Sequence, residues 1–278
     1  MEINNMKTQL VCGIKNYYVE NGFKNILIGL SGGLDSSLVL ALACEAIGPQ
    51  NIHTFMLKTK YTSKQSIQLA QKAANLNTVK HTEINIQPIV DSFLKNIPLN
   101  RSNPVTEQNI QARTRGVVLM MYANEYNSLL LACSNKSEAS VGYCTLYGDV
   151  CGGLSPIGDI FKTDVYKLAN LLNQEGKYLI PTEIIQRPPT AELTNNQKDT
   201  DSLPPYEVLD KILKDHIFDN KPIDKKNAEL INSIQKKYKL SAFKRAQMPP
   251  VITIKKWVVI HSFFIFLEYL VYNRQNNP

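Results

Sequence analysis

The chain has 278 residues, 44% of them hydrophobic, and a formal net charge of +7 at pH 7. This length accommodates one large domain with room for an appendage, and the composition excludes a fibrous, repetitive or disordered chain. The five cysteines form no CxxC pair, so reduced thiols are expected, not a zinc site or a disulfide framework. The amino terminus, MEINNMKTQL, lacks the apolar core of a signal peptide, and we therefore expect a cytoplasmic protein.

The positive charge does not by itself indicate nucleic-acid binding. Most lysines are scattered or lie on polar faces of predicted helices, such as Lys211, Lys214 and Lys236, and residues of this kind usually form a solvated surface. No RNA-binding signature accompanies them. A basic protein also suits a polyanionic small substrate. We expect no nucleic-acid partner.

The first half of the chain alternates short apolar runs with helices. In chain order we expect a helix at 6–20, a strand at Asn25–Leu30, a helix at Ser36–Ala46, a strand at Ile52–Leu57, a helix at Ser63–Leu76, a strand at Val79–Ile86, helices at Pro88–Lys95 and Thr106–Tyr126, and a strand at Ser128–Cys133. The helix after the first strand is apolar nearly all round, which predicts a central position. Strands alternating with such helices predict an α/β fold, a doubly wound and mostly parallel sheet flanked by helices.

The second half changes character after Lys162. We expect helices at Thr163–Asn173, Pro205–Phe218 and Ala228–Tyr238, separated by polar or Pro-rich connections. They are interpreted as a helical C-terminal extension of one unit that spans residues 1–255. The segment Asn195–Pro205 is polar and then Pro-rich. We expect it to be a lid that orders when substrates bind and excludes water.

The sequence SGGLDS, residues 31–36, joins the first strand to the apolar helix. Its glycines let backbone amides approach an oxyanion and permit positive φ angles. Its serines add hydroxyl donors, and the next helix presents its positive end. Asp35 would repel a phosphate unless a cation lies between them, which indicates Mg²⁺. The turn lacks the lysine of a P-loop and the spacing of a dinucleotide-binding loop; an ordinary capped turn is the competing interpretation.

SGGLDS after a strand resembles the pyrophosphate-binding loop of the ATP pyrophosphatases. Four later stretches resemble NAD synthetase and follow the order of that family: 109–116 (NIQARTRG), 133–169, 187–210 and 243–255. With the turn they cover most of the chain from about residue 24 to 255, and they are most similar to the synthetase portion of the glutamine-dependent branch. The resemblance implies that the nicotinate carboxylate of deamido-NAD attacks ATP to give a carboxyl-adenylate and pyrophosphate. Ammonia then displaces AMP and leaves NAD.

The resemblance also implies roles for individual residues. It assigns magnesium binding to Asp35 and Glu138, and catalysis to Asp35 and Lys162. Because the turn has no lysine, a remote one is needed to balance the departing pyrophosphate, which favours Lys162. The positions matched to ATP binding are Ser31, Gly32, Gly33, Leu34, Asp35, Ser36, Cys133, Lys162 and Thr190.

Three basic residues match positions that contact the dinucleotide substrate: Arg113, Lys244 and Arg245. Arg115 is a nearby rival of Arg113, and an exposed helix face explains either arginine without a ligand. The basic pair at 244–245 can likewise be read as a surface charge pair. The resemblance places that pair on a late, mobile segment that closes on the substrate.

The chain departs from the ammonia-dependent branch at three positions. Cys133 stands where many members have a threonine, Leu146 where they have a lysine, and Gly153 where they have an aspartate. The glutamine-dependent branch normally carries an upstream glutaminase domain, and too few residues precede the turn here to hold one. We therefore expect free ammonia, or a separate glutaminase partner that supplies it. By resemblance, a homodimer is expected.

The C-terminal tail, residues 256–278, is atypical for the family. It is markedly apolar but contains His261, Ser262 and Glu268, and it is short for a membrane span. It is interpreted as a packed terminal helix or strand, with a dimer contact, a membrane anchor and an altered reading frame as alternatives. We expect no membrane partner.

Two alternatives to NAD synthesis stay open. The first is another ATP-pyrophosphatase amide ligase or tRNA-modifying ligase. The second is a non-catalytic nucleotide-binding subunit. The joint presence of the loop, both magnesium carboxylates and Lys162 favours an enzyme, because a binding module does not need all of them together.

Overall fold

The computed structural model describes residues 2–98, 100, 102–174, 179–195, 197–223 and 227–254. Its centre is a four-stranded, fully parallel sheet in the order β3-β2-β1-β4. The strands are β1 (Asn25–Gly29), β2 (Ile52–Lys58), β3 (Lys80–Asn85) and β4 (Ser128–Leu131). Because β1 pairs with both β2 and β4, its carboxyl end lies in the middle of the sheet edge where such folds bind ligands.

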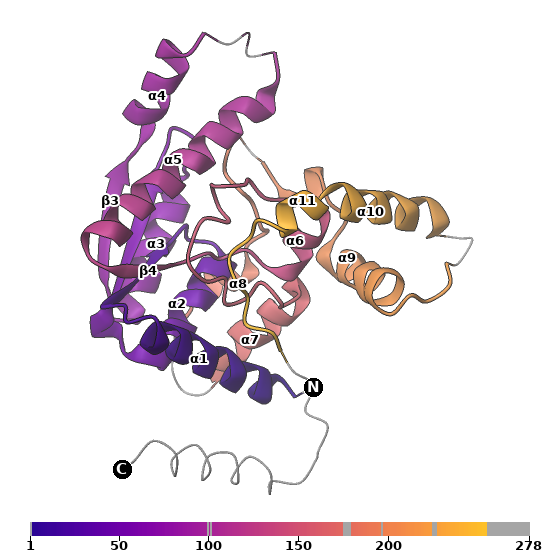
Figure 1. The fold of residues 1–278 in the computed structure, drawn as a ribbon, viewed down its shortest axis with the longest axis horizontal. Coiled ribbons are helices and arrows are strands. Elements are labelled where there is room, and N and C mark those ends of the chain that lie inside the picture. Colours follow the sequence, from indigo (N-terminus) through magenta and orange to yellow (C-terminus); the bar gives the residue numbers. More distant parts are fainter. Residues whose placement is uncertain are drawn as a thin grey trace, which may run out of the picture.

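Alternate residues of β1 face two different helical layers, which confirms the doubly wound α/β fold (Figure 1). Ile26 and Ile28 pack in a cluster with α1 (Ile3–Glu20), α2 (Leu34–Ile47), α3 (Lys64–Leu76) and α7 (Lys162–Gln174). Leu27 packs on the other face in a cluster with α4 (Gln87–Asn96) and α5 (Pro104–Glu125). Strands buried on both faces read as continuous apolar runs, which is why β1, β2 and β4 were predictable.

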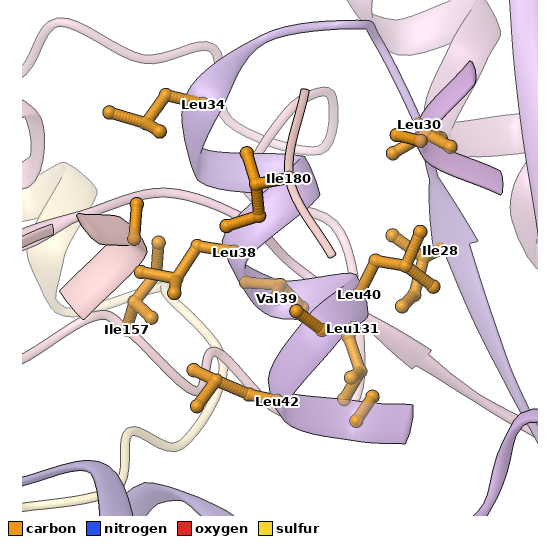
Figure 2. Close-up of a cluster of buried hydrophobic side chains, with 14 of the residues drawn as sticks. Ile28, Leu30, Leu34, Leu38, Val39, Leu40, Leu42, Leu131, Ile157 and Ile180 are labelled. Atoms are coloured by element: carbon orange, nitrogen blue, oxygen red, sulfur yellow. The ribbon is translucent and has the colours of Figure 1, made fainter. Parts of the chain in front are cut away.

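Helix α2 lies at the centre of the larger cluster, as its apolar sequence predicts. Every residue from Ser36 to Ala43 is buried. Figure 2 shows its leucines among side chains of β1, β4 and later segments, including Ile157 and Ile180. The helix begins at Leu34, two residues before the predicted start, because Gly33 in extended conformation is its N-cap.

The C-terminal extension is helical, as predicted, and has its own small core. In Figure 1 it lies to the right of the sheet, away from α4. The core contains Leu209 and Ile231, both buried, and unites short helices from different parts of the chain. These are α6 (Lys136–Val141), α9 (Tyr206–Ile212), the π-helical η3 (Leu213–Phe218) and α10 (Ala228–Leu240).

Several short elements were not predicted. They are η1 (Pro49–Asn51), α6, α8 (Thr182–Gln186), η2 (Asp199–Asp201) and α11 (Ala242–Arg245). Helices this short carry too little periodicity to be recognised in a sequence. The tail predicted over 256–278 lies outside the described residues. Among the helices that the structure describes, none combines the length and apolarity needed to cross a membrane.

Two histidines on neighbouring strands are each paired with a threonine of the other strand. His53 Nε2 lies 2.8 Å from Thr82 Oγ1, and His81 Nδ1 lies 2.8 Å from Thr54 Oγ1. Burial, reinforced by the charges of Lys80 and His81, lowers the pKa of His53 from 6.5 to about 4. Burial also lowers the pKa of His81. Both imidazoles are therefore neutral in the folded protein at neutral pH.

We predict that this pair makes the fold sensitive to mild acid. Between pH 6.5 and about 4, His53 binds a proton in the unfolded chain but stays neutral in the folded protein. The free energy of unfolding therefore falls as the pH falls. Urea unfolding of the wild type and of His53→Gln at several pH values measures the effect. The variant should lose less stability across this window, whereas above pH 7 the difference between the proteins should be constant. Parallel curves at all pH values would contradict the assignment.

Candidate active site

The turn SGGLDS, called the phosphate turn from here on, connects β1 to α2 at the carboxyl edge of the sheet. Gly32 has a φ of +76°, and a Cβ at this position would lie 2.3 Å from the carbonyl oxygen of Ser66 in α3. The position therefore requires glycine for two reasons: its backbone conformation and the close approach of another helix. Sequence reasoning identified the first reason, but the contact with Ser66 is visible only in the fold.

The serines of the phosphate turn bond to the turn itself in this structure. Ser31 Oγ lies 3.1 Å from Ser36 Oγ and accepts a hydrogen bond from the Gly33 amide at 3.2 Å. Ser37 Oγ donates to the Gly33 carbonyl at 2.8 Å. Leu34 turns its side chain into the core, as Figure 2 shows, and leaves only its backbone to a ligand. These hydrogen bonds therefore fix the backbone conformation of the turn.

Lys162 lies between the two carboxylates predicted to bind magnesium. Its ammonium contacts Asp35 Oδ2 and lies 3.3 Å from Glu138 Oε1, with only 2% of its side chain exposed. Burial alone would lower the pKa of Lys162, but the charges of Asp35 and Glu138 outweigh it and the pKa rises. Burial raises the pKa of Glu138 to about 7 against the opposing charge of Lys162. These three residues are called the Lys162 cluster.

Asn135 joins the two carboxylates and was not identified from the sequence. It is fully buried, its Nδ2 donates to Asp35 Oδ1 at 3.0 Å, and its Oδ1 accepts from the Glu138 amide at 3.0 Å. The second bond makes Asn135 the N-cap of α6. The spacing of Asn135 and Glu138, three residues apart, is a capping signal that could have revealed it.

A second buried network positions the backbone of Lys162. Ser137 Oγ accepts from the Lys162 amide at 2.8 Å and donates to Asp210 Oδ1, while Asp210 Oδ2 accepts from the Thr163 amide at 2.8 Å. Asp210 comes from α9 in the C-terminal extension and is 2% exposed. A carboxylate at the first amides of α7 also interacts favourably with the helix dipole.

The residues present fit a magnesium ion. Asp35 and Glu138 offer hard oxygen ligands, and Mg²⁺ commonly takes one or two carboxylates while water and phosphate complete its shell. Among the described residues, no three or more His, Cys, Asp or Glu side chains are grouped in an arrangement that could hold a metal. The ammonium of Lys162 lies at both carboxylates, where a cation is stabilised.

The other residues matched to ATP lie at two places. Cys133 follows β4, where burial raises the pKa of its thiol and the charges of Asp35 and Glu138 raise it further. Thr190 donates its hydroxyl to the Gln197 carbonyl and accepts from the Glu192 amide at 3.2 Å. In this structure Thr190 therefore stabilises its own loop.

The residues matched to the dinucleotide all donate to backbone carbonyls of the stretch from Ser140 to Leu146. Arg113 is exposed on α5, and its Nε donates to the Leu146 carbonyl at 3.2 Å. Lys244 donates to the Gly142 carbonyl at 2.8 Å, and Arg245 donates to the Ser140 carbonyl at 3.0 Å. The basic pair thus binds the C-terminal end of α6, the helix that carries Glu138, where cations are favoured by the helix dipole.

Arg115, the rival of Arg113, points into the protein. Its Nε donates to the Leu57 carbonyl at 3.1 Å, at the carboxyl end of β2. Burial lowers the pKa of Arg115 to about 10, although Glu192 and Asp149 oppose this effect. Arg113 and Arg115, two positions apart on α5, therefore lie in different surroundings: the first is exposed, and the second points into the protein.

A half-buried carboxylate, that of Glu192, also lies beside the phosphate turn on the α3 side. Glu192 Oε1 accepts from Ser63 Oγ at 2.8 Å and from Ser66 Oγ at 2.7 Å, and it pairs with Arg187 Nη2 at 2.6 Å. Ser66 is the residue whose carbonyl lies against Gly32. Glu192 therefore anchors its loop next to the turn, and no pattern in the sequence indicated this.

The fold and the site together define a class of protein: an α/β protein whose phosphate turn, helix N-terminus and lysine–carboxylate cluster suit a phosphorylated ligand. Comparison with known proteins agrees, since the family model for NAD synthase matches residues 6–249. The chain belongs to the NAD synthase family.

Individual relatives support this membership. The chain is 41% identical over 250 residues to a glutamine-dependent NAD(+) synthetase from Xanthomonas campestris, an alignment that covers 87% of this chain and 45% of the relative. It thus spans about half the length of such relatives. An NH3-dependent NAD synthetase structure from Campylobacter jejuni matches with a TM-score of 0.73 at 26% identity, covering 92% of this chain and all (100%) of that one. An NMN synthetase structure from Francisella tularensis matches with a TM-score of 0.75 at 25% identity, covering 95% and 100%.

We predict that Gly32→Ala damages the site more than a matched substitution elsewhere. Gly22 also has a positive φ, +66°, but a Cβ there meets nothing within 4 Å. Gly22→Ala should therefore show only the conformational cost, about 1 kcal/mol. Gly32→Ala should lose more unfolding free energy, because the new Cβ overlaps Ser66, and should weaken ATP binding by about tenfold or more. Urea unfolding and titration calorimetry measure both, and equal effects of the two variants would contradict the argument.

Proposed function

We propose that the protein catalyses ATP-dependent amidation of deamido-NAD to NAD through a carboxyl-adenylate that ammonia attacks, with release of AMP and pyrophosphate. The observation that carries the proposal is the buried ammonium of Lys162 beside a phosphate turn that lacks a lysine of its own. Membership of the NAD synthase family supports the product. The C. jejuni relative, an NH3-dependent NAD synthetase, supports the nitrogen donor.

In this proposal the chain's own residues position two polyanions and manage charge. The phosphate turn binds the β- and γ-phosphates of ATP through its backbone amides and through Ser31 and Ser36. Lys162 balances the charge that develops on pyrophosphate as it departs. Asp35 and Glu138 would hold Mg²⁺, which would neutralise phosphate charge. Cys133 and Thr190 complete the ATP contacts.

The substrate side of the proposal rests on Arg113, Lys244 and Arg245. Each is a cation that suits the phosphates or the carboxylate of deamido-NAD. Because Lys244 and Arg245 bind α6 carbonyls in this structure, engaging a substrate requires them to exchange those partners. This fits the mobile, closing segment expected for the basic pair. The segment predicted as a lid, Asn195–Pro205, would exclude water from the bound substrates.

Partners and assembly are part of the same proposal. Ammonia is either free or supplied by a glutaminase, as in the glutamine-dependent relatives. A homodimer is supported by large apolar side chains exposed on α4 and α5, among them Phe93, Val117 and Met121. A cytoplasmic location fits the reduced state proposed for the cysteines, which are free where the structure describes them.

One assay tests the function. Purified protein with ATP, Mg²⁺, deamido-NAD and ammonium should form NAD and AMP in equal amounts. Replacing ammonium by glutamine tests the nitrogen donor, and replacing deamido-NAD by nicotinate mononucleotide tests the product named for the F. tularensis relative. Absence of AMP with every nitrogen donor would refute the enzyme and favour a non-catalytic nucleotide-binding subunit. AMP formation with another acceptor only would favour a different ATP-pyrophosphatase ligase.

Substitutions in the Lys162 cluster should remove catalysis. We expect Asp35→Asn and Lys162→Met to lower kcat by about 100-fold or more, because the first removes a carboxylate that would hold Mg²⁺ and the second removes the cation that balances the departing pyrophosphate. Lys136→Met is the matched control: Lys136 also forms an ion pair, with Asp159 at 2.8 Å, and lies on α6 outside the cluster. It should keep near wild-type kcat. Melting temperatures separate catalytic loss from unfolding, and full turnover by Asp35→Asn would refute its role.

A further inference from the structure

Asp199 is a buried carboxylate to which the proposed reaction assigns no role. It is 4% exposed, and each of its oxygens accepts a hydrogen bond from a tyrosine. Tyr143 donates to Oδ1 at 3.2 Å and Tyr206 donates to Oδ2 at 2.8 Å. Tyr143 follows α6 and Tyr206 begins α9, so three separate segments meet at one carboxylate. This group of three side chains is called the tyrosine clasp.

The clasp touches the Lys162 cluster directly. Tyr206 Oη lies 3.3 Å from Glu138 Oε1, and Lys162 Nζ lies 5.2 Å from the centre of the Tyr206 ring. The ring therefore makes a cation–π contact with the buried ammonium. Burial, together with the charges of Glu138 and Asp199, raises the pKa of Tyr206, so its hydroxyl stays protonated and donates.

The segment that carries Asp199 is anchored on both sides of the phosphate turn. We define it as residues 187–195 and 197–203. Its first part is fixed by Glu192 to Ser63 and Ser66, next to Gly32. Its second part is fixed by Asp199 next to Glu138 and Lys162. The segment is therefore bound at two places: beside Gly32 of the phosphate turn, and beside Glu138 and Lys162.

We propose that Asp199 is a positioning residue that, through Tyr143 and Tyr206, holds residues 197–203 against the Lys162 cluster and so keeps water away from the activated carboxylate. The inference rests on the proposed function. In the side reaction that it prevents, water oxygen bonds to the carboxyl carbon and the carbon–oxygen bond to AMP breaks. AMP leaves with the electron pair and a proton passes to solvent. The net result is hydrolysis of ATP to AMP and pyrophosphate, with deamido-NAD regenerated.

The test compares AMP with NAD formed by the full chain. Tyr143→Phe removes one hydrogen bond to Asp199, and loss of a bond to a charged group makes local release of the order of tenfold more frequent. AMP should then exceed NAD in Tyr143→Phe and, more strongly, in Asp199→Asn. Raising the ammonium concentration should reduce the excess, because ammonia and water compete for the same carbon. A purely structural defect would lower both products together and leave their ratio unchanged.

Two matched variants serve as controls. Asp91→Asn removes a carboxylate charge from α4, where Asp91 Oδ1 accepts from Gln87 Nε2 at 2.7 Å. Tyr18→Phe removes a hydroxyl that donates to the Lys24 carbonyl at 2.8 Å, far from the clasp in sequence. Both should give AMP and NAD in equal amounts.

The outcomes are separable. One outcome is that the wild type is active and that Tyr143→Phe and Asp199→Asn form AMP and NAD in equal amounts at every ammonium concentration. That result would contradict the role proposed for the tyrosine clasp and leave the proposed function unaffected. A wild type that forms neither product would overturn the proposed function and the clasp with it. If Asp199→Asn does not fold, Tyr143→Phe decides alone, since its change is a single hydroxyl and melting temperature verifies its fold.

Discussion

The buried ammonium of Lys162 is the interaction on which the site depends. Moving a charged amine out of water costs several kcal/mol, and only close counter-charges offset that cost. Asp35 and Glu138 supply them from α2 and α6, while Lys162 itself begins α7. One ion-paired group therefore links three helices at the site. Removing one partner of such a pair typically costs about 3–5 kcal/mol, because the other charge is left buried and unpaired.

The residues around the Lys162 cluster also hold its side chains and backbone in place. Asn135 caps α6 and holds Asp35, and Asp210 caps α7 from the C-terminal extension. The phosphate turn is fixed on its other side by the contact of Gly32 with Ser66. Asn135 and Asp210 each accept from a backbone amide that would otherwise lack a partner. These bonds fix the positions of Asp35, Glu138 and the start of α7 relative to one another.

Much of the fold was predictable because its signals are local. The apolar strands, the apolar α2 and the amphipathic α3 and α10 follow from periodicity, and the phosphate turn follows from its glycines and serines. Asp199, Glu192 and Asp210 were not identified as anchors, because their partners lie between 47 and 129 residues away in most cases. Long-range pairing of this kind leaves no periodic trace in one sequence.

The substrate-side residues show a second limit. Resemblance located Lys244 and Arg245, but the structure shows their donors engaged with carbonyls at the end of α6. A cation at a helix C-terminus is stable without any ligand. The resemblance and the structure thus assign different partners to the same two side chains, and the sequence alone is compatible with either.

The capping of α7 by Asp210 has a consequence for biosynthesis. All four strands have been synthesised once Leu131 emerges from the ribosome, whereas Asp210 emerges much later. Domains generally fold as units while synthesis proceeds from the amino terminus. The nascent chain therefore possesses its sheet and phosphate turn well before the start of α7 is secured. In a chain that has not yet reached Asp210, the Thr163 amide lacks the carboxylate that accepts from it in the complete fold, and the neighbouring Lys162 lacks that support.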